Sequence, residues 1–365
     1  MAERPGNFGR IKPFAVKRGN MKAIILLIPL FIFQNIFAQG VTPKDWGLKE
    51  FHIANEELGD IYFYITEEGI DEEKPLLFIA QGSGGLPTMI LVQCEEKSIQ
   101  LGTVPPDIIM KFSDQFHVAY IGKAGTPFCD TVTVEEIKPM EILENYQPSE
   151  EYIRKCGMEW QIEASSTVID SLCNMLPISG HKVIALGVSE GGRIVSKLAV
   201  ENNKITHLVC MVSDGLNQFY SSIINARTDA AAGKITHQEA QAIVDSLFST
   251  YEKIYSDPHS TEKSWYGHPY QRWASFCTDI PLEHLVKLEI PIYMLNGSAD
   301  RNAPILQADY VMLEFLRLGK SNLTYRVLPG CEHSLYEVVI KDGKEEGISH
   351  RDEAFKMVVD WIVSN

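Results

Sequence analysis

The sequence predicts an α/β protein with a mostly parallel central sheet and helices on both faces. Its 365 residues are 45% hydrophobic and 22% charged, a composition typical of folded globular proteins. Continuous apolar runs of strand length alternate with segments of helical periodicity along most of the chain. Such runs indicate strands buried on both faces, and their alternation with helices indicates parallel pairing. Functional side chains of such sheets collect where the strands end.

The expected elements follow one another in a regular order. An antiparallel hairpin or sheet edge is predicted within residues 46–66, where apolar and polar residues alternate. Buried strands are predicted at 75–80, 116–121, 181–186, 205–212, 291–295 and 323–328. Helices are predicted over 150–176, 305–318 and 351–363, and Gly319 is placed to end the second of them.

The interval 215–288 interrupts this alternation. It contains a helical stretch at 237–254 and an aromatic-rich segment at 265–273. We interpret it as a helical cap inserted between two strands, placed over the site. The alternative is a second small domain that does not contact the site. The predicted organisation is a leader at 1–38 and one domain at 39–365 that contains the cap.

The first 38 residues resemble a secretory leader rather than part of the fold. Lys22 precedes an apolar run over residues 23–33, and the small residue Ala38 follows at a suitable cleavage distance. A membrane-spanning helix needs about 20 apolar residues, and Gln34 and Asn35 interrupt this run earlier. We therefore expect a signal peptide at 21–38, preceded by an upstream extension, and export to the periplasm or the exterior. An uncleaved membrane anchor is the alternative, but no stable anchor is expected after cleavage.

Charge and cysteine content exclude several classes of protein. The net charge of −15 becomes −20 once the leader is removed, because six of the 33 basic residues and one of the 48 acidic residues lie in it. A chain this acidic repels phosphate backbones, so nucleic acid is not an expected partner. Seven cysteines without a CxxC or a zinc-type spacing predict neither a disulfide scaffold nor a metal site. The pattern predicts no particular disulfide pairing and no particular oligomeric state.

The strongest chemical signal is Gly187-Val-Ser189-Glu190-Gly191. The predicted strand 181–186 leads into it, and a helical pattern begins at Arg193. A sharp strand-to-helix turn needs small residues beside the serine, and it presents the serine hydroxyl at the open end of the sheet. Ser189 is therefore the predicted nucleophile. The alternative is a plain glycine-rich connection.

A serine nucleophile needs a base and a group that orients the base. His333 follows the predicted strand 323–328, and Asp300 follows the predicted strand 291–295. Because both lie at strand ends, as Ser189 does, the three side chains can converge. Asp214, which follows the strand 205–212, is the rival for the acid.

A developing oxyanion requires backbone N–H donors. We expect one from Glu190, directly after the nucleophile, and one from the turn 81–85, with Ser83 favoured and Gly84 as the alternative. A phosphate cradle is the rival interpretation of this turn, but the turn lacks the spacing of the known phosphate-binding motifs.

Together, the Gly-x-Ser-x-Gly motif, the late Asp300 and His333 and the Gly82–Gly85 turn resemble the α/β-hydrolase superfamily over about residues 60–365, outside the insertion. The resemblance implies a triad of Ser189, Asp300 and His333, a serine-dependent hydrolytic mechanism and no cofactor. Gln81-Gly82 replaces the common His-Gly oxyanion motif. The run Gly-x-Ser-Glu-Gly-Gly resembles exported bacterial esterases and, less closely, prolyl-oligopeptidase-like peptidases.

These observations predict an exported carboxylic ester hydrolase that acts on a small molecule, with a serine peptidase or aminopeptidase acting on peptides as the alternative. A catalytically inactive binding protein is the third class, which an intact triad disfavours. In the insertion, Trp265, Tyr266, Tyr270 and Trp273 offer flat apolar surface for substrate, and Arg272 could bind a substrate carboxylate. The competing interpretation is that these aromatic residues pack the core of the cap itself.

Overall fold

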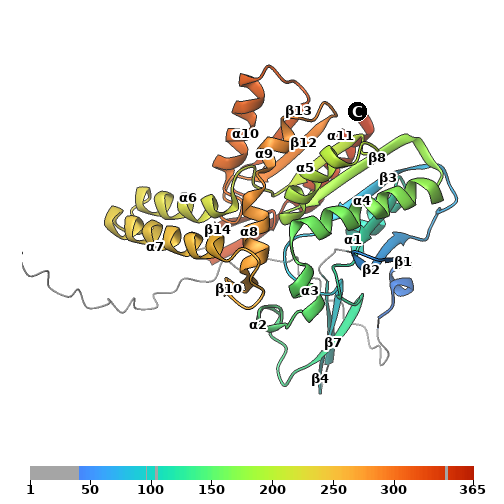
Figure 1. Cartoon of the computed structure of the whole chain (residues 1–365), viewed down its shortest axis with the longest axis horizontal. Helices are drawn as coiled ribbons and strands as arrows, with labels where there is room; N and C mark the ends of the chain where they lie inside the picture. The colour runs from blue at the N-terminus through green and yellow to red at the C-terminus, as the bar shows by residue number, and fades with distance from the viewer. Residues whose placement is uncertain (1–40, 96, 103–105, 342–343) are drawn as a thin grey trace, which may run out of the picture.

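In the computed structural model, a twisted sheet of eight strands forms the centre of the molecule (Figure 1). The structure describes residues 41–365 except 96, 103–105 and 342–343. The strand order is β1-β2-β6-β3-β8-β9-β12-β13. The strands span Leu48–Asn55 (β1), Gly59–Thr66 (β2), His117–Ile121 (β6), Lys74–Ala80 (β3), Ile178–Val188 (β8), His207–Met211 (β9), Ile292–Gly297 (β12) and Leu323–Leu328 (β13).

Six neighbouring strands, from β6 to β13, are parallel, whereas β1 and β2 pair antiparallel at one edge. The edge pair begins with the 3-10 turn Pro43–Trp46 and confirms the predicted hairpin. All six predicted buried strands are present, with ends that differ by a few residues. The strands of the mostly parallel sheet therefore end close to the positions predicted from the sequence.

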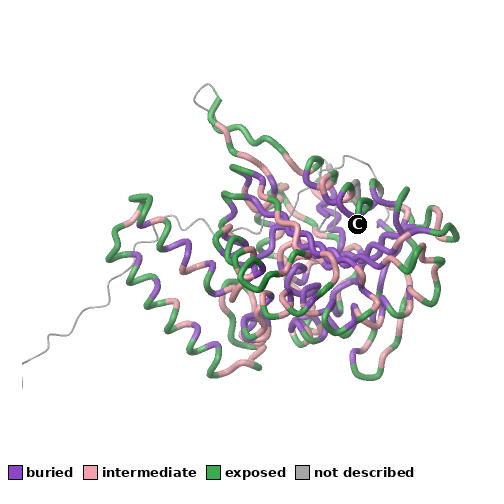
Figure 2. The backbone as a smooth tube through the Cα atoms, turned by 90° about the horizontal axis from the view of Figure 1, so that it is seen from above, coloured by how far each residue is buried: buried purple, intermediate pink, exposed green. Residues whose placement is uncertain are grey.

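Helices cover both faces of this sheet because its strands expose apolar side chains on both sides. Leu76 and Phe78 of β3 face a core formed with α4 (Met158–Met175), α5 (Glu190–Glu201) and α10 (Ile305–Arg317). Leu77 and Ile79 face the opposite core, formed with α1 (Pro106–Ser113) and α11 (Arg351–Ser364). Buried residues accordingly concentrate in the middle of the main body (Figure 2).

The predicted helix 150–176 is two helices, α3 (Glu150–Lys155) and α4. The chain breaks at Gly157, which has extended dihedral angles, and the freed N–H of Met158 donates to the hydroxyl of Ser275 at 2.8 Å. A side chain from the distant insertion thus caps α4, which local periodicity could not reveal.

Outside the interval 215–288, two small sheets were not predicted. Between β3 and α3 the chain forms β4 (Met89–Cys94), β5 (Lys97–Gly102) and β7 (Cys129–Thr133), which make a separate three-stranded sheet that packs with α2 (Pro139–Asn145). After His333, β14 (Tyr336–Lys341) and β15 (Lys344–Ser349) form a hairpin. Most of these strands are partly exposed and lack the continuous apolar runs of the main sheet, but β4 contains a buried apolar run at residues 89–92 that the sequence prediction missed.

The interval 215–288 contains four helices and a short hairpin. α6 (Gln218–Ala231) and α7 (His237–Ser256) form a helical hairpin that projects from the main body, and α7 begins with a capping box of Thr236 and Glu239 (Figure 1). The hairpin of β10 (Ser264–Trp265) and β11 (His268–Pro269) then leads into α8 (Tyr270–Thr278) and α9 (Pro281–Leu285).

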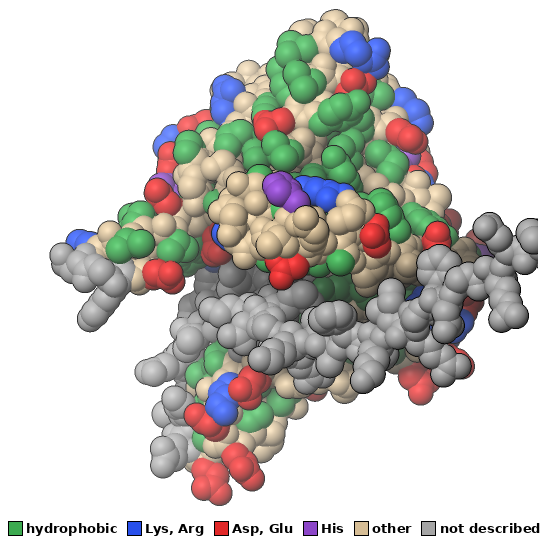
Figure 3. Space-filling model, turned by 90° about the vertical axis from the view of Figure 1, so that its left-hand side faces the viewer, with side chains coloured by type: hydrophobic (Ala, Val, Ile, Leu, Met, Phe, Trp, Pro, Cys, Tyr) green, Lys and Arg blue, Asp and Glu red, His purple; other side chains and the backbone are tan. Residues whose placement is uncertain are grey.

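The outer surface of α10 carries several exposed apolar side chains. One face of the helix packs on the sheet through Val311 and Phe315, while Leu306, Tyr310, Leu313 and Leu316 are 45–62% exposed. Hydrophobic side chains also gather in the upper part of the molecule in Figure 3, the level at which α10 lies in Figure 1.

The predicted leader, including its signal peptide, lies outside the described residues. In the described part of the chain, no helix combines the length and hydropathy needed to cross a membrane. All seven cysteines are free.

Candidate active site

Ser189 lies on the sharp turn between β8 and α5, with a positive φ of 57°. Such a backbone costs a non-glycine residue roughly 1–3 kcal/mol, so the surrounding structure must hold it in place. The motif glycines permit the turn. A Cβ atom at Gly187 would collide with the backbone of Gly191, and one at Gly191 would collide with the carbonyl of Ala80. The turn therefore presents Ser189 at the carboxyl end of the sheet, beside the N-terminus of α5.

Two loops bring an imidazole and a carboxylate to this serine. His333 Nε2 lies 2.9 Å from Ser189 Oγ, and His333 Nδ1 lies 2.7 Å from Asp300 Oδ2. The other oxygen of Asp300 accepts the N–H groups of Asn302 and Ala303 at 2.7 and 2.9 Å, which fixes the carboxylate. An ionised carboxylate only accepts hydrogen bonds, so Nδ1 carries the proton and Nε2 has a lone pair toward Ser189. The arrangement can pass a proton from the hydroxyl to the imidazole.

The rival acid is engaged elsewhere. Asp214 Oδ1 lies 2.6 Å from Nε of Arg193 on α5, and both side chains are buried. The structure thus brings Asp300, and not Asp214, to the imidazole.

The predicted oxyanion donors lie on both sides of Ser189. Glu190 is the first residue of α5, where N–H groups have no partner within the helix. The turn 81–85 approaches from β3: a Cβ atom at Gly82 would lie 3.7 Å from Cβ of Ser189. Gln81 holds this turn by donating from Nε2 to the carbonyl of Ile121 at 3.0 Å. Ser83 and Gly84 therefore follow a residue that lies beside the serine.

Glu190 also belongs to a buried charge network. Its carboxylate accepts from Nε of Arg272 at 3.0 Å and from the Nη2 group of Arg272, and Nζ of Lys123 lies 3.6 Å away. All three side chains are at most 4% exposed. Burial alone would raise the pKa of Glu190, but the charges of Arg272 and Lys123 hold it at about 2. We call Glu190, Arg272 and Lys123 the charge network.

The structure places Arg272, proposed to bind a substrate carboxylate, in a buried ion pair instead. Its guanidinium donates hydrogen bonds to the carboxylate of Glu190 and to Oε1 of Gln218, the latter at 2.9 Å. It also stacks on the rings of Trp273 and Phe276. At 1% exposure it has no surface to offer a ligand in this conformation.

The aromatic residues of the insertion mostly contact one another. Trp265 and Tyr270 pack against a buried cluster that includes Phe219, Tyr251 and Trp273. Phe219 stacks on Tyr251 with a centroid distance of 3.8 Å, and Nε1 of Trp273 donates to the carbonyl of Trp265 at 2.7 Å. This packing favours the competing interpretation, a core for the insertion, over substrate contact by Trp265 and Tyr270.

Sequence reasoning missed Lys123. The sequence contains a signal for it: Lys123 lies two residues after a buried strand (116–121) that adjoins β3, and it is therefore at the same end of the sheet as Ser189.

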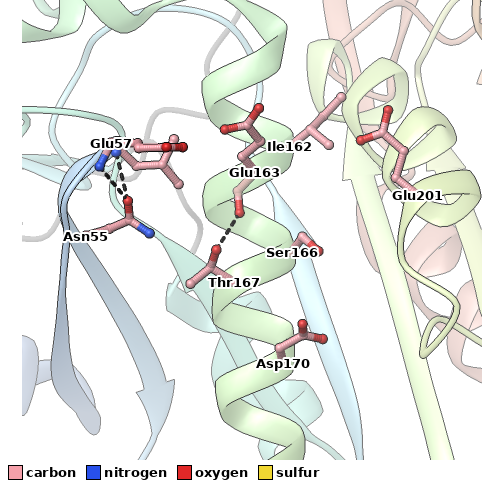
Figure 4. Close-up of a pocket in the computed structure, with 9 residues that line it drawn as sticks. Asn55, Glu57, Ile162, Glu163, Ser166, Thr167, Asp170 and Glu201 are labelled. Carbon is pink, nitrogen blue, oxygen red and sulfur yellow. Dashed lines mark hydrogen bonds between the residues drawn. The ribbon is translucent and has the colours of Figure 1, made fainter.

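A separate polar groove lies between the β1–β2 turn, α4 and α5 (Figure 4). It is lined by carboxylates and hydroxyls of Glu57, Glu163, Ser166, Asp170 and Glu201. Asn55 closes one side through hydrogen bonds to the N–H groups of Glu57 and Leu58. None of the predicted site residues lines this groove.

Solved structures resemble this architecture at low sequence identity. The uncomplexed acylaminoacyl peptidase of Pyrococcus horikoshii matches with a TM-score of 0.52 and 10% identity, over 86% of this chain and 41% of that one. Dipeptidyl peptidase 4 of Porphyromonas gingivalis matches with a TM-score of 0.50 and 13% identity, over 87% of this chain and 35% of that one. The chain has the α/β-hydrolase fold.

The α/β-hydrolase fold confirms the fold class and the resemblance predicted from the motifs. The chain spans about two fifths of the length of these peptidases or less. No protein-family model matches the sequence. The search of curated proteins gave no match.

Proposed function

We propose that the protein is a serine hydrolase that cleaves acyl bonds through an acyl-enzyme on Ser189. The observation that carries this proposal is the continuous line from Ser189 through His333 to Asp300, with distances of 2.9 and 2.7 Å. A hydroxyl in contact with an oriented imidazole is activated as a nucleophile, whereas an isolated serine is not.

In the first half of the reaction, His333 Nε2 takes the Oγ proton as Ser189 attacks the substrate carbonyl. The tetrahedral oxyanion accepts hydrogen bonds from the N–H groups of Glu190 and Ser83. His333 then returns the proton to the leaving amine or alcohol, and the acyl-enzyme remains. A water molecule, deprotonated by His333, attacks the acyl carbon, and His333 returns that proton to Ser189 Oγ as the acid is released. Asp300 holds the ring and stabilises its cationic form throughout.

We propose peptides or acylated peptides as the substrate class. Support comes from the two similar structures described above, which are both peptidases, and from a similar structure of acylaminoacyl peptidase in complex with Z-Gly-Gly-Phe-chloromethyl ketone. The second candidate is the carboxylic ester hydrolase that the sequence favoured. Its support is the Gly-x-Ser-Glu-Gly-Gly run and a triad that serves ester and amide cleavage alike.

The test is a substrate panel on the purified protein: aminoacyl and N-acyl-peptidyl p-nitroanilides beside p-nitrophenyl esters of increasing acyl length. We expect anilide turnover that depends on Ser189, with a kcat/KM that varies with the aminoacyl or peptidyl group. Turnover of the esters without any turnover of the anilides would favour the second candidate. Wild-type rates in Ser189→Ala would remove the proposal altogether.

Export is part of the proposal. It is supported by the basic start, the apolar run at 23–33 and Ala38. N-terminal sequencing of the protein recovered from the exterior or periplasm of expressing cells should give Gln39 as the first residue. Recovery of full-length chain from the cytoplasm alone would contradict export.

A further inference from the structure

Lys123 is a buried cation in contact with the turn that approaches Ser189. It follows β6, its side chain is 4% exposed, and its ammonium donates a hydrogen bond to the carbonyl of Gly82. The same ammonium lies 3.6 Å from Oε1 of Glu190. Burying a lysine is costly unless its charge is balanced and its protons are bonded, so this placement needs a reason.

The carbonyl that Lys123 binds belongs to the same peptide unit as the N–H of Ser83. The described chain has no cis peptide bond, and in a trans peptide the carbonyl and the N–H point in opposite directions. A hydrogen bond to the Gly82 oxygen therefore fixes the plane of this peptide and directs the Ser83 N–H away from Lys123. The positive charge of the Lys123 ammonium beside the Gly82 oxygen also polarises the peptide unit and strengthens the Ser83 N–H as a donor.

The other group in contact with Lys123 is Glu190, the residue of the first predicted oxyanion donor. Glu190 supplies its backbone N–H directly after Ser189, and its carboxylate faces Lys123. Arg272 of the insertion holds that carboxylate from the far side. One ammonium thus connects the residue of the first predicted donor with the peptide of the second.

We infer that Lys123 is a positioning residue for the oxyanion site, and that it aligns the Ser83 N–H with the Glu190 N–H. The inference rests on the proposed function and makes Ser83, rather than Gly84, the donor from the 81–85 turn. It predicts that loss of Lys123 slows acylation while substrate binding in the ground state changes little.

The experiment compares Lys123→Met with Lys74→Met. Lys74 is the matched control: it is buried, donates to the carbonyl of Ser113 at 3.1 Å and pairs with Glu72 at 2.9 Å, but it lies at the opposite end of β3. Lys123→Met is expected to fold because the balanced pair of Glu190 and Arg272 remains. If it does not fold, Lys123→Gln carries the same comparison.

Each variant is assayed for kcat and KM on the best substrate of the panel. Rates are expressed per active serine, counted by exhaustive fluorophosphonate labelling, so that partial unfolding does not lower the result. We expect Lys123→Met to lose about 10- to 100-fold in kcat with KM within threefold, because a displaced oxyanion donor acts only in the transition state. Lys123→Gln, which keeps a donor, should lose less, and Lys74→Met should retain wild-type kcat.

The inference is overturned if kcat per active serine of Lys123→Met stays within threefold of wild type, or if Lys74→Met shows the same loss. Ser189→Ala is run in the same assay. Turnover that survives Ser189→Ala overturns the proposed function instead, so the two failures are distinguishable.

Discussion

Two polar networks meet at neighbouring residues of this chain, and they differ in origin. The triad joins Ser189, His333 and Asp300, all from loops at the ends of main-sheet strands. The charge network joins Glu190 to Lys123 of the loop after β6 and to Arg272 of α8 in the insertion. The triad is thus internal to the fold, whereas the charge network ties the insertion to it. Side chains that follow the strands of the main sheet can be predicted to meet from their order in the sequence. Contacts made by an insertion cannot be predicted in this way.

The comparison predicts that the triad can be broken without loss of the fold. Asp300→Asn keeps an acceptor for the N–H groups of Asn302 and Ala303 but cannot stabilise a cationic His333. We expect kcat to fall by about 10⁴-fold. Circular dichroism and the melting temperature should stay close to those of wild type. A loss below tenfold would show that Asp300 does not orient the base.

The charge network, in contrast, should contribute mainly to the free energy of unfolding. Replacing its anion, Glu190, should lower that free energy more than replacing either cation. Glu190→Gln leaves two buried cations without a counter-charge, and we expect it to cost about 3–5 kcal/mol in urea unfolding. Arg272→Met leaves the pair of Glu190 and Lys123 and should cost less, roughly 1–3 kcal/mol, most of it lost packing on Trp273 and Phe276. The reverse order of the two variants would contradict a network balanced by Glu190.

Acid should weaken the insertion side of the molecule through His268. Burial and the charge of Arg272 lower the pKa of His268 to about 3. Between pH 6.5 and 3 the unfolded chain therefore binds a proton that the folded chain does not, and stability falls as the pH falls. His268→Gln should remove this loss, which amounts to about 2 kcal/mol between pH 7 and 4.5.

The measurement is urea unfolding of wild type and His268→Gln across this pH range. His259→Gln, at an exposed histidine of the same insertion, is the control and should follow the wild-type profile. Parallel profiles for all three proteins would assign the acid sensitivity to other groups.

The smallest effect is expected where the insertion touches neither network. Phe248 on α7 is 51% exposed. Phe248→Ser should change the unfolding free energy by less than about 0.5 kcal/mol and leave kcat unaltered. A marked loss of activity would show that the projecting hairpin itself contributes to substrate binding. It would contradict the view that the insertion acts on the site only through the charge network.

The extent of sequence prediction follows the same division. The strands of the main sheet were predictable because their apolar runs are long and are followed by glycines or polar residues, as after Ala80 and after Leu186. The triad was predictable because each member follows such a strand. The break between α3 and α4 was not, because its cap comes from Ser275, and no local pattern encodes a partner over a hundred residues away.

The ion pair of Arg272 was not predicted for a related reason. A sequence with an arginine among aromatic residues is compatible with a ligand-binding site and with a buried ion pair. The two differ only in whether a carboxylate of the protein faces the arginine. That carboxylate, Glu190, lies inside the nucleophile motif, where the sequence was interpreted through its backbone N–H and its side chain was overlooked. The small sheet β5-β4-β7 was missed although β4 carries a buried apolar run at residues 89–92, because β5 and β7 have no such run.

The contact between α8 and Glu190 has a consequence for engineering and divergence of this protein. Insertions in such sheets are natural places to exchange specificity, since they connect to the fold through loops. Here the insertion supplies the counter-ion of the residue beside the nucleophile, so it is not a detachable module. Grafting another cap onto this scaffold would have to bring an arginine in the same register or replace Glu190 together with it.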